Sequence, residues 1–192
     1  MLANMPNNIQ IAKKSWLHGN VVRLARLHFL YVVAFTVQTV IYDSWKLIAP
    51  NAVLYRWIVS ASLLVITTFV WYVAKSHISS TAACRLLVWT LIIVDIAAAS
   101  FNVYSQRGMA SLAVALYTIP IIVAAVLRSR AAIFAAATLA VAAYSSTAIA
   151  YFVLNFNEGY KIQLYGDVGF YCAIFFVIAG LLAAVVRPVK AQ

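Results

Sequence analysis

Charge is scarce in this chain, and acidic residues are scarcer still. Of 192 residues, 9% are charged and only 4 are Asp or Glu, whereas 66% are hydrophobic. A soluble domain is normally about one-quarter charged. A chain of this size and composition could not hide its apolar surface from water. The composition therefore excludes a soluble globular protein and indicates a membrane protein.

The motifs of soluble enzymes are also absent from the sequence. It contains no Gly-rich phosphate loop, no paired carboxylates and no Ser-His-Asp or Cys-His set. The 3 His and 2 Cys residues show no metal-ligand spacing, so we expect no metal site and no cofactor. Enzymatic activity is left open, but these absences favour a non-enzymatic role.

Long apolar stretches follow one another along the chain. Each is long enough to cross about 30 Å of hydrocarbon as a helix. The predicted spans are Leu27–Ile48, Val53–Ala74, Ala83–Val103, Ala110–Leu127, Ala131–Leu154 and Val168–Val186. Short connections favour antiparallel neighbours. The sequence thus predicts an all-α, polytopic membrane protein whose six transmembrane helices form one bundle.

The basic residues give an orientation. With the N-terminus inside, the inner segments carry Lys13, Lys14, Arg23, Arg26, Lys75, Arg85, Arg128, Arg130, Arg187 and Lys190, whereas the outer segments carry only Lys46, Arg56, Arg107 and Lys161. Excess Lys and Arg marks the cytoplasmic side. We therefore expect both termini in the cytoplasm and a multi-pass location in the cytoplasmic (inner) membrane. Because membrane topology explains the basic residues, the partner they imply is the lipid bilayer and not a nucleic acid.

The segment before the first span has a different pattern. Residues 8–18 read as a short amphipathic helix, which we expect to end at Gly19, with Asn20 capping the next helix. Such a helix suits either an interfacial anchor on the inner leaflet or a docking element for a soluble partner. The predicted organisation is an interfacial segment at 1–19 and a six-helix transmembrane domain at 20–192.

Asp95 is the one acidic residue that falls at membrane depth, in the middle of the third span. Intramembrane acids are costly and mark functional sites or interhelical hydrogen bonds. The polar residues that could face it are Gln38, Thr67, Thr68, Tyr117 beside Pro120, and the run Tyr144, Ser145, Ser146 and Thr147. Pro120 also frees a backbone carbonyl one turn earlier. Asp95, Tyr117, Pro120, Tyr144, Ser145 and Thr147 therefore form a hypothetical ligand or ion site, and a purely structural Asp95 is the alternative.

A second group of polar and aromatic residues is predicted at the outer face. It comprises Asp43, Trp45, Tyr55, Arg56, Asn102, Arg107, Glu158, Tyr160 and Asp167, with the last three in the longest predicted loop, 155–167. These residues suit a binding surface for a small molecule or partner. They suit an aromatic interfacial belt equally well. Arg56 is expected to form a surface ion pair with Asp43 or Asp167.

Small residues recur at four-residue spacing in the last two spans. Span five has Ala132, Ala136 and Ala140, and span six has Gly169 with Ala173 and Gly180 with Ala184. Such rows let helices approach closely in lipid. They predict packing within the bundle or, alternatively, contact with another membrane helix.

One stretch resembles a known family. A Gly-containing loop, Gln106 to Ser111, leads into a span with the mid-helix Pro120, and a basic turn at Arg128 and Arg130 precedes an Ala-rich helix that continues to Tyr144. This pattern is similar to the six-helix membrane input modules of bacterial sensor histidine kinases. The resemblance covers about a quarter of the chain. It departs from the family's Ser-Pro in the outer loop, and we expect no kinase domain here, so it implies fold and sensing style only.

Three functions are compatible with these features. The first is a non-catalytic sensor or accessory subunit that acts through a membrane or cytoplasmic protein partner. The second is a solute-binding transport subunit, similar to the substrate-binding component of energy-coupling-factor transporters, with a small-molecule ligand. The third is a small proton- or ion-coupled transporter that uses Asp95. The resemblance favours the first.

Overall fold

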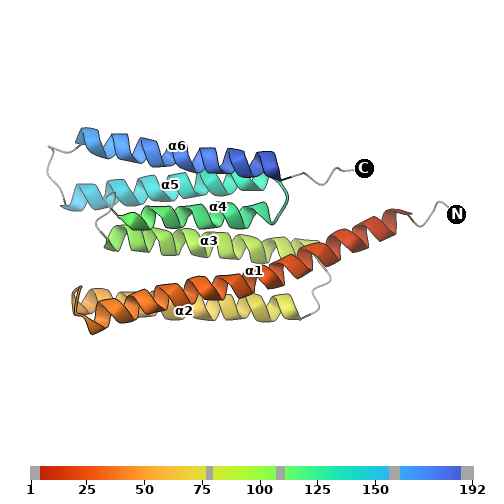
Figure 1. Ribbon diagram of the computed structural model, residues 1–192, viewed down its shortest axis with the longest axis horizontal. Coiled ribbons are helices and arrows are strands. Elements are labelled where there is room, and N and C mark those ends of the chain that lie inside the picture. Colours follow the sequence, from red (N-terminus) through yellow and green to blue (C-terminus); the bar gives the residue numbers. More distant parts are fainter. Residues whose placement is uncertain (1–4, 77–79, 107–110, 156–160, 187–192) are drawn as a thin grey trace. The chain divides into compact units, whose positions relative to one another are not determined.

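A computed structural model describes residues 5–76, 80–106, 111–155 and 161–186 of the protein. Every regular element in these ranges is a helix (Figure 1). In chain order they are α1 (Met5–Ser44), α2 (Pro50–Lys75), α3 (Thr81–Ser105), the 3-10 helix η2 (Leu112–Tyr117), α4 (Thr118–Ala125), α5 (Arg130–Asn155) and α6 (Lys161–Val185). Each predicted span overlaps one of these helices, so the prediction of an all-α, six-helix membrane fold is confirmed.

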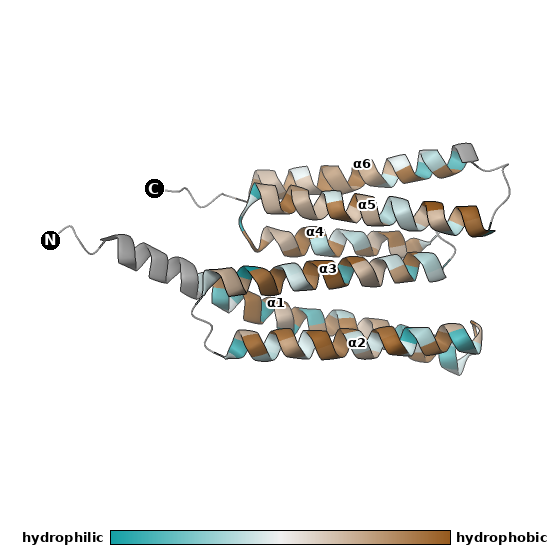
Figure 2. Ribbon diagram, turned by 180° about the vertical axis from the view of Figure 1, so that it is seen from behind, coloured by the Kyte–Doolittle hydropathy of each residue, from teal (hydrophilic) through white to brown (hydrophobic). Residues whose placement is uncertain are grey.

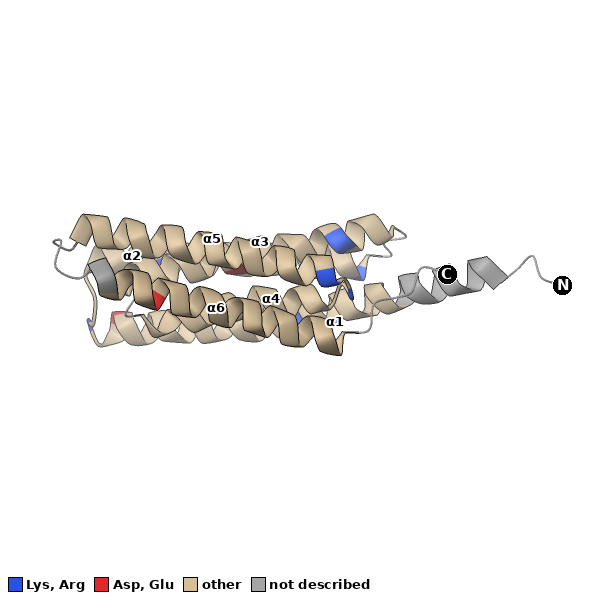
Figure 3. Ribbon diagram, turned by 90° about the horizontal axis from the view of Figure 1, so that it is seen from above, with Lys and Arg blue, Asp and Glu red and all other residues tan. Residues whose placement is uncertain are grey.

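Five helices in the described ranges are long and apolar enough to cross a bilayer: Trp16–Ser44 within α1, then α2, α3, α5 and Gln163–Val185 within α6. The fourth, Leu112–Ala125, is apolar but shorter. Figure 2 shows brown and pale turns along α2 and α6, with teal turns toward the ends of α2 and toward the N-terminal end of α6. Figure 3 shows most of each ribbon in tan, with basic and acidic residues limited to a few turns.

The chain divides into two compact units, of which the first ends at Val88 and the second begins at Trp89. In the first unit, α1 and α2 form an antiparallel hairpin. Its turn follows from the sequence: α1 ends at Ser44, Lys46 takes a left-handed φ of 52°, and Pro50 occupies the first turn of α2. Pro is favoured there because it has no N–H to leave unsatisfied.

Buried positions on α2 recur at alternating intervals of three and four residues. They are Val53, Arg56, Ser60, Leu63, Thr67, Val70 and Ala74. This heptad-like spacing produces one continuous contact face along the helix. Side-chain hydrogen bonds join that face to α1: His28 Nδ1 lies 2.8 Å from Thr67 Oγ1, and Thr36 Oγ1 lies 2.6 Å from Ser60 Oγ. The hairpin is therefore held by polar contacts as well as by apolar packing.

The N-terminal prediction needs a correction. α1 is one uninterrupted helix of 40 residues that passes through Gly19 and Asn20, so the predicted helix end at Gly19 is wrong. A Gly in a helix interior costs about 1 kcal/mol relative to Ala, which a long helix tolerates. Leu17 and Val21, on either side of Gly19, are buried and continue the contact face. The interfacial role of residues 1–19 stays a prediction.

In the second unit, α5 presents a face of small side chains. Ala132, Ala136 and Ala140 are all buried, as the first predicted small-residue row requires. Arg130 Nε donates to the Ala183 carbonyl at 3.1 Å and so joins the start of α5 to the end of α6. The second row behaves differently, because Ala173 on α6 is exposed.

The start of the sixth span and the end of the loop before it differ from their predicted positions. α6 begins at Lys161, seven residues before the predicted start of the sixth span. The predicted loop 155–167 is therefore wrong in its second half, and Asp167 lies within a helix. The polar residues Lys161, Gln163 and Asp167 made this part read as a loop, although each can extend a membrane helix into the interface.

Candidate functional site

The centre of the second unit is a group of aromatic and hydroxyl side chains. We name the five residues Ser100, Tyr117, Tyr144, Tyr171 and Phe175 the tyrosine cluster. They come from α3, η2, α5 and α6, so four elements meet in it. Two of them, Tyr117 and Tyr144, are members of the predicted ligand site, and both are 0% exposed.

Local sequence explains how Tyr117 reaches this position. Ser111 caps η2 by accepting a hydrogen bond from the Ala113 N–H at 3.0 Å. η2 changes to α4 after Tyr117, three residues before the buried Pro120. Pro120 cannot donate to the carbonyl four residues earlier, which disfavours a regular α-helix through this turn. In the structure, Pro120 lies just after the change from 3-10 helix to α-helix that follows Tyr117. Its predicted part in a ligand site stays a prediction.

Tyr117 is fixed by hydroxyl contacts and by rings. Its Oη lies 2.7 Å from Ser100 Oγ, and Thr147 is a second hydrogen-bonding side chain near it. The ring centroid lies 5.7 Å from that of Tyr144 and 5.8 Å from that of Phe175. Edge-to-face and tilted aromatic pairs at these separations are favourable beyond their burial. Of the residues in the predicted site, the structure thus brings Tyr144 and Thr147 to Tyr117.

Tyr144 contacts the rings of three other cluster members, Tyr117, Tyr171 and Phe175. Its centroid is 5.7 Å from that of Tyr171 and 5.9 Å from that of Phe175, at interplanar angles of 79° and 83°. The hydroxyl oxygen is buried and has no hydrogen-bond partner among the residues that the structure describes. Its neighbour in the sequence, Ser145, contacts α6 separately, with Oγ 3.4 Å from Cys172 Sγ.

Asp95 does not share the α3 face that holds the tyrosine cluster. It is 1% exposed, five residues before Ser100 on the same helix. At about 100° per residue, the two side chains leave the helix about 140° apart. Of the other predicted neighbours, Thr67 contacts His28 and Gln38 Nε2 donates to Tyr42 Oη, both within the first unit. The tyrosine cluster therefore lies on another face of α3 than Asp95, and the predicted ligand or ion site around Asp95 stays a prediction.

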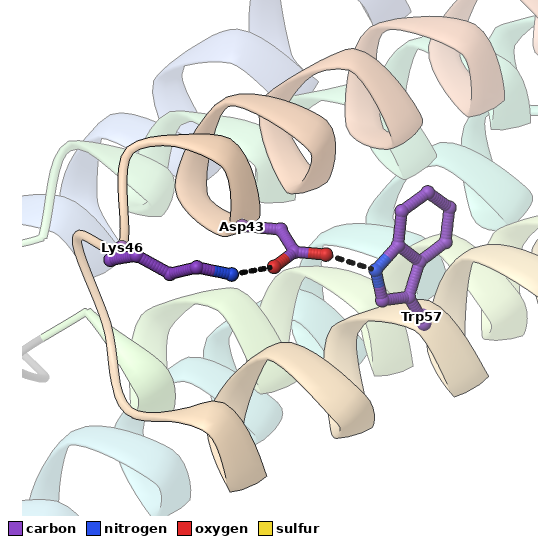
Figure 4. A network of polar contacts seen from close by, with 3 residues as sticks. All are labelled: Asp43, Lys46 and Trp57. Carbon is purple, nitrogen blue, oxygen red and sulfur yellow. Dashed lines mark hydrogen bonds and ion pairs between the residues drawn. The ribbon is translucent and has the colours of Figure 1, made fainter.

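The turn of the α1–α2 hairpin holds the predicted outer-face residue Asp43. One carboxylate oxygen accepts from Lys46 Nζ at 3.0 Å and the other from Trp57 Nε1 at 3.3 Å (Figure 4). Arg56 is 1% exposed, so the predicted surface location of its ion pair is wrong, and its guanidinium lies 4.7 Å from the ring centroid of Tyr42. Asp43 is thus held by Lys46, which is closer in sequence and more exposed.

The remaining outer-face predictions have mixed outcomes. Trp45 and Tyr55 are 72% and 60% exposed, as either a belt or a binding surface requires. Asn102 is 0% exposed and donates to the Ala98 carbonyl at 2.9 Å, which does not suit an interfacial belt, and its place in an outer-face binding site stays a prediction. Asp167 is half-buried on α6. Arg107, Glu158 and Tyr160 lie outside the described residues.

Sequence reasoning missed three members of the cluster: Ser100, Tyr171 and Phe175. Tyr171 and Phe175 are four residues apart on α6 and share a face, which is a detectable signal. In a span that also contains Phe170 and Phe176, this signal could not be separated from ordinary apolar composition.

A search of curated proteins and a search of solved structures each found no match. Residues 7–191 match a six-transmembrane family described as the PilS-like transmembrane domain. The resemblance therefore extends over nearly the whole chain, and the predicted coverage of a quarter is wrong, because apolar helix positions carry too little individual signal to be recognised singly. The chain is an integral, multi-pass membrane protein, and it belongs to the PilS-like transmembrane domain family.

Proposed function

We propose that this protein is a non-catalytic sensor module of the cytoplasmic membrane that acts through a protein partner. The observation that carries the proposal is the family match over residues 7–191, which concerns a transmembrane domain. The similarity to the six-helix input modules of sensor histidine kinases supplies the functional class. In such a module the membrane helices receive a signal, and a separate protein surface or domain uses it.

The second unit offers a plausible element for receiving a signal. A single group of side chains joins α3, η2, α5 and α6 through ring contacts and the Ser100–Tyr117 hydrogen bond. A change at one member alters the contacts of the other three elements. Coupling of this kind requires a packed element with two arrangements that the signal biases differently.

Orientation is part of the proposal. We place both termini in the cytoplasm, because the inner segments then hold most of the basic residues. The α4–α5 turn, with Arg128 and Arg130, would then be cytoplasmic and available to a partner. A cysteine introduced at exposed Ser76 should then be labelled by a membrane-impermeant maleimide only after the cells are opened, and one at exposed Asn51 should be labelled in intact cells.

The direct test is native mass spectrometry of the protein extracted gently from its own membranes, after mild cross-linking. A stoichiometric partner chain is the expected result. The variant Arg130→Glu, which reverses one charge of the α4–α5 turn, should bind the partner more weakly, and SDS unfolding separates this effect from loss of the Arg130–Ala183 hydrogen bond. Purification of the protein alone, with and without cross-linking, would count decisively against a role through a partner.

A second candidate is a proton-coupled transporter that uses Asp95, and the burial of this acid at 1% exposure favours it. Proton transfer through the membrane needs a group that can gain and lose a proton there. In vesicles with a pH gradient, wild-type protein should then carry a proton flux that Asp95→Asn abolishes. Equal fluxes for the two forms would remove this candidate.

A further inference from the structure

We propose that the tyrosine cluster binds a neutral, lipid-soluble molecule with a hydrogen-bond-accepting carbonyl, of the quinone class, and that the Tyr144 hydroxyl donates to that carbonyl. This deepens the proposed function by naming the class of signal. The inference that the bound molecule is a signal rests on the proposed function, whereas binding itself can be measured without any partner.

The first argument is the Tyr144 hydroxyl itself. The residue is 0% exposed, and its oxygen has no hydrogen-bond partner within the described ranges. Buried polar groups almost always have a partner, and one without it requires an explanation. The hydroxyl is not needed for packing, because a Phe at this position would keep the ring contacts with Tyr117, Tyr171 and Phe175. A ligand acceptor would explain why a hydroxyl is present.

The second argument is the position of Tyr144 on α5. Four residues to either side on the same face are Ala140 and Ala148, which are 0% and 1% exposed. The buried face of this helix is otherwise mostly alanine near its centre. One aromatic hydroxyl in a row of methyl groups gives the face a single polar point at membrane depth.

The third argument is the chemistry of the surroundings. The side chains in the cluster carry no formal charge: they are hydroxyl groups and aromatic rings. An anionic ligand would lose its hydration, gain no opposite charge from these groups and be repelled by Asp167, which acts electrostatically on Tyr144. An ammonium cation could pair with Asp167 but has no acceptor for the hydrogen bond that the Tyr144 hydroxyl can donate. A flat ring with a carbonyl matches them, because it can replace an edge-to-face contact and accept a hydrogen bond. The location within membrane-crossing helices favours entry from the lipid.

The alternative occupant of the same hydroxyl is a water molecule, since water also accepts a hydrogen bond. Water and a quinone share the acceptor chemistry but differ in their dependence on added lipophile. The test therefore uses decylubiquinone, whose ring is fully substituted and does not add thiols. Decylbenzene, which has the chain and ring but no carbonyl, is the matched control ligand.

The experiment measures equilibrium retention of decylubiquinone by the full chain in phosphatidylcholine nanodiscs. We expect saturable binding to wild type, and about tenfold weaker binding to Tyr144→Phe because one hydrogen bond is lost. The control variant is Tyr165→Phe, on the same unit but 64% exposed, which should bind within twofold of wild type. Absence of saturable binding, or equal affinity in Tyr144→Phe, overturns the proposal. Equal binding of decylbenzene also overturns it.

A second readout needs no variant. Cys172, half-buried and 3.4 Å from Ser145, lies one residue after Tyr171 and can report occupancy through its alkylation by N-ethylmaleimide. Bound quinone should slow alkylation of Cys172 and leave that of Cys84 unchanged, and an unchanged rate at Cys172 overturns the proposal. Because partner association is measured separately, quinone binding without a partner would refute only the proposed function, and a partner without quinone binding would refute only this inference.

Discussion

The hydrogen bond between Ser100 and Tyr117 should be an energetic link between α3 and η2. Ser100 Oγ lies 2.8 Å from the Ile96 carbonyl and 2.7 Å from Tyr117 Oη. A serine hydroxyl can donate one hydrogen bond, and Ser100 donates it to the Ile96 carbonyl. Tyr117 is therefore the donor to Ser100. Replacing Tyr117 by Phe removes the donor and leaves the Ser100–Ile96 bond in place.

The magnitude follows from hydrogen bonds between membrane helices, which average about 0.6 kcal/mol and reach about 1.7 kcal/mol in double-mutant cycles. Because Tyr117 is 0% exposed, we expect a coupling energy of about 1 kcal/mol between Tyr117→Phe and Ser100→Ala. Tyr117→Phe should lower the free energy of unfolding by more than Ser100→Ala, because it also removes the contact with Thr147. The double variant should cost little more than Tyr117→Phe alone.

The assay is reversible unfolding by SDS in mixed detergent micelles, followed by circular dichroism. Ser62→Ala is the matched control, because Ser62 donates to the Ile58 carbonyl at 2.8 Å and is exposed. Combined with Tyr117→Phe, it should show additive effects. A coupling energy within about 0.3 kcal/mol of zero for the Ser100 pair would refute the reasoning, since that is the range of independent sites.

Three further perturbations test other contacts. Arg130→Gln should destabilise the second unit by about 1 kcal/mol through loss of the charged donor to the Ala183 carbonyl, and Arg130→Lys should restore only part of this, as SDS unfolding would show. Asp95→Asn should change the unfolding free energy by less than Asp95→Leu does, because the amide keeps hydrogen-bonding capacity. A larger loss of unfolding free energy in Asp95→Asn than in Asp95→Leu would contradict this. Ser60→Ala should cost about 0.6 kcal/mol in the α1–α2 hairpin, because Thr36 keeps its bond to the Val32 carbonyl, and a cost above about 2 kcal/mol would contradict it.

The helices could be predicted from the sequence because their ends carry local signals. Pro50 marks the start of α2, and the ends predicted for the second and third spans lie within two residues of the helix ends. The signal fails where a residue has two meanings. Gly19 can end a helix or lie inside one, and the structure has the second.

The site was harder to predict for a physical reason. In a membrane protein both the lipid-facing and the buried sides of a helix are apolar, so hydrophobic periodicity does not give the rotation of each helix. Tyr117 and Tyr144 could be brought together because both are polar interruptions of apolar runs. The rotation that separates Asp95 from Ser100, and that buries Asn102, has no counterpart in composition.

The short fourth helix has a consequence for the surrounding lipid. η2 and α4 together comprise 14 residues, which extend about 24 Å when the 3-10 part rises about 2.0 Å and the α part about 1.5 Å per residue. This is about 6 Å less than a typical hydrocarbon core. Thinning a bilayer to match costs fractions of a kcal/mol per ångström. The length of the lipid acyl chains should therefore act directly on the short helix that carries Tyr117. The packing of this helix should differ between thin and thick membranes.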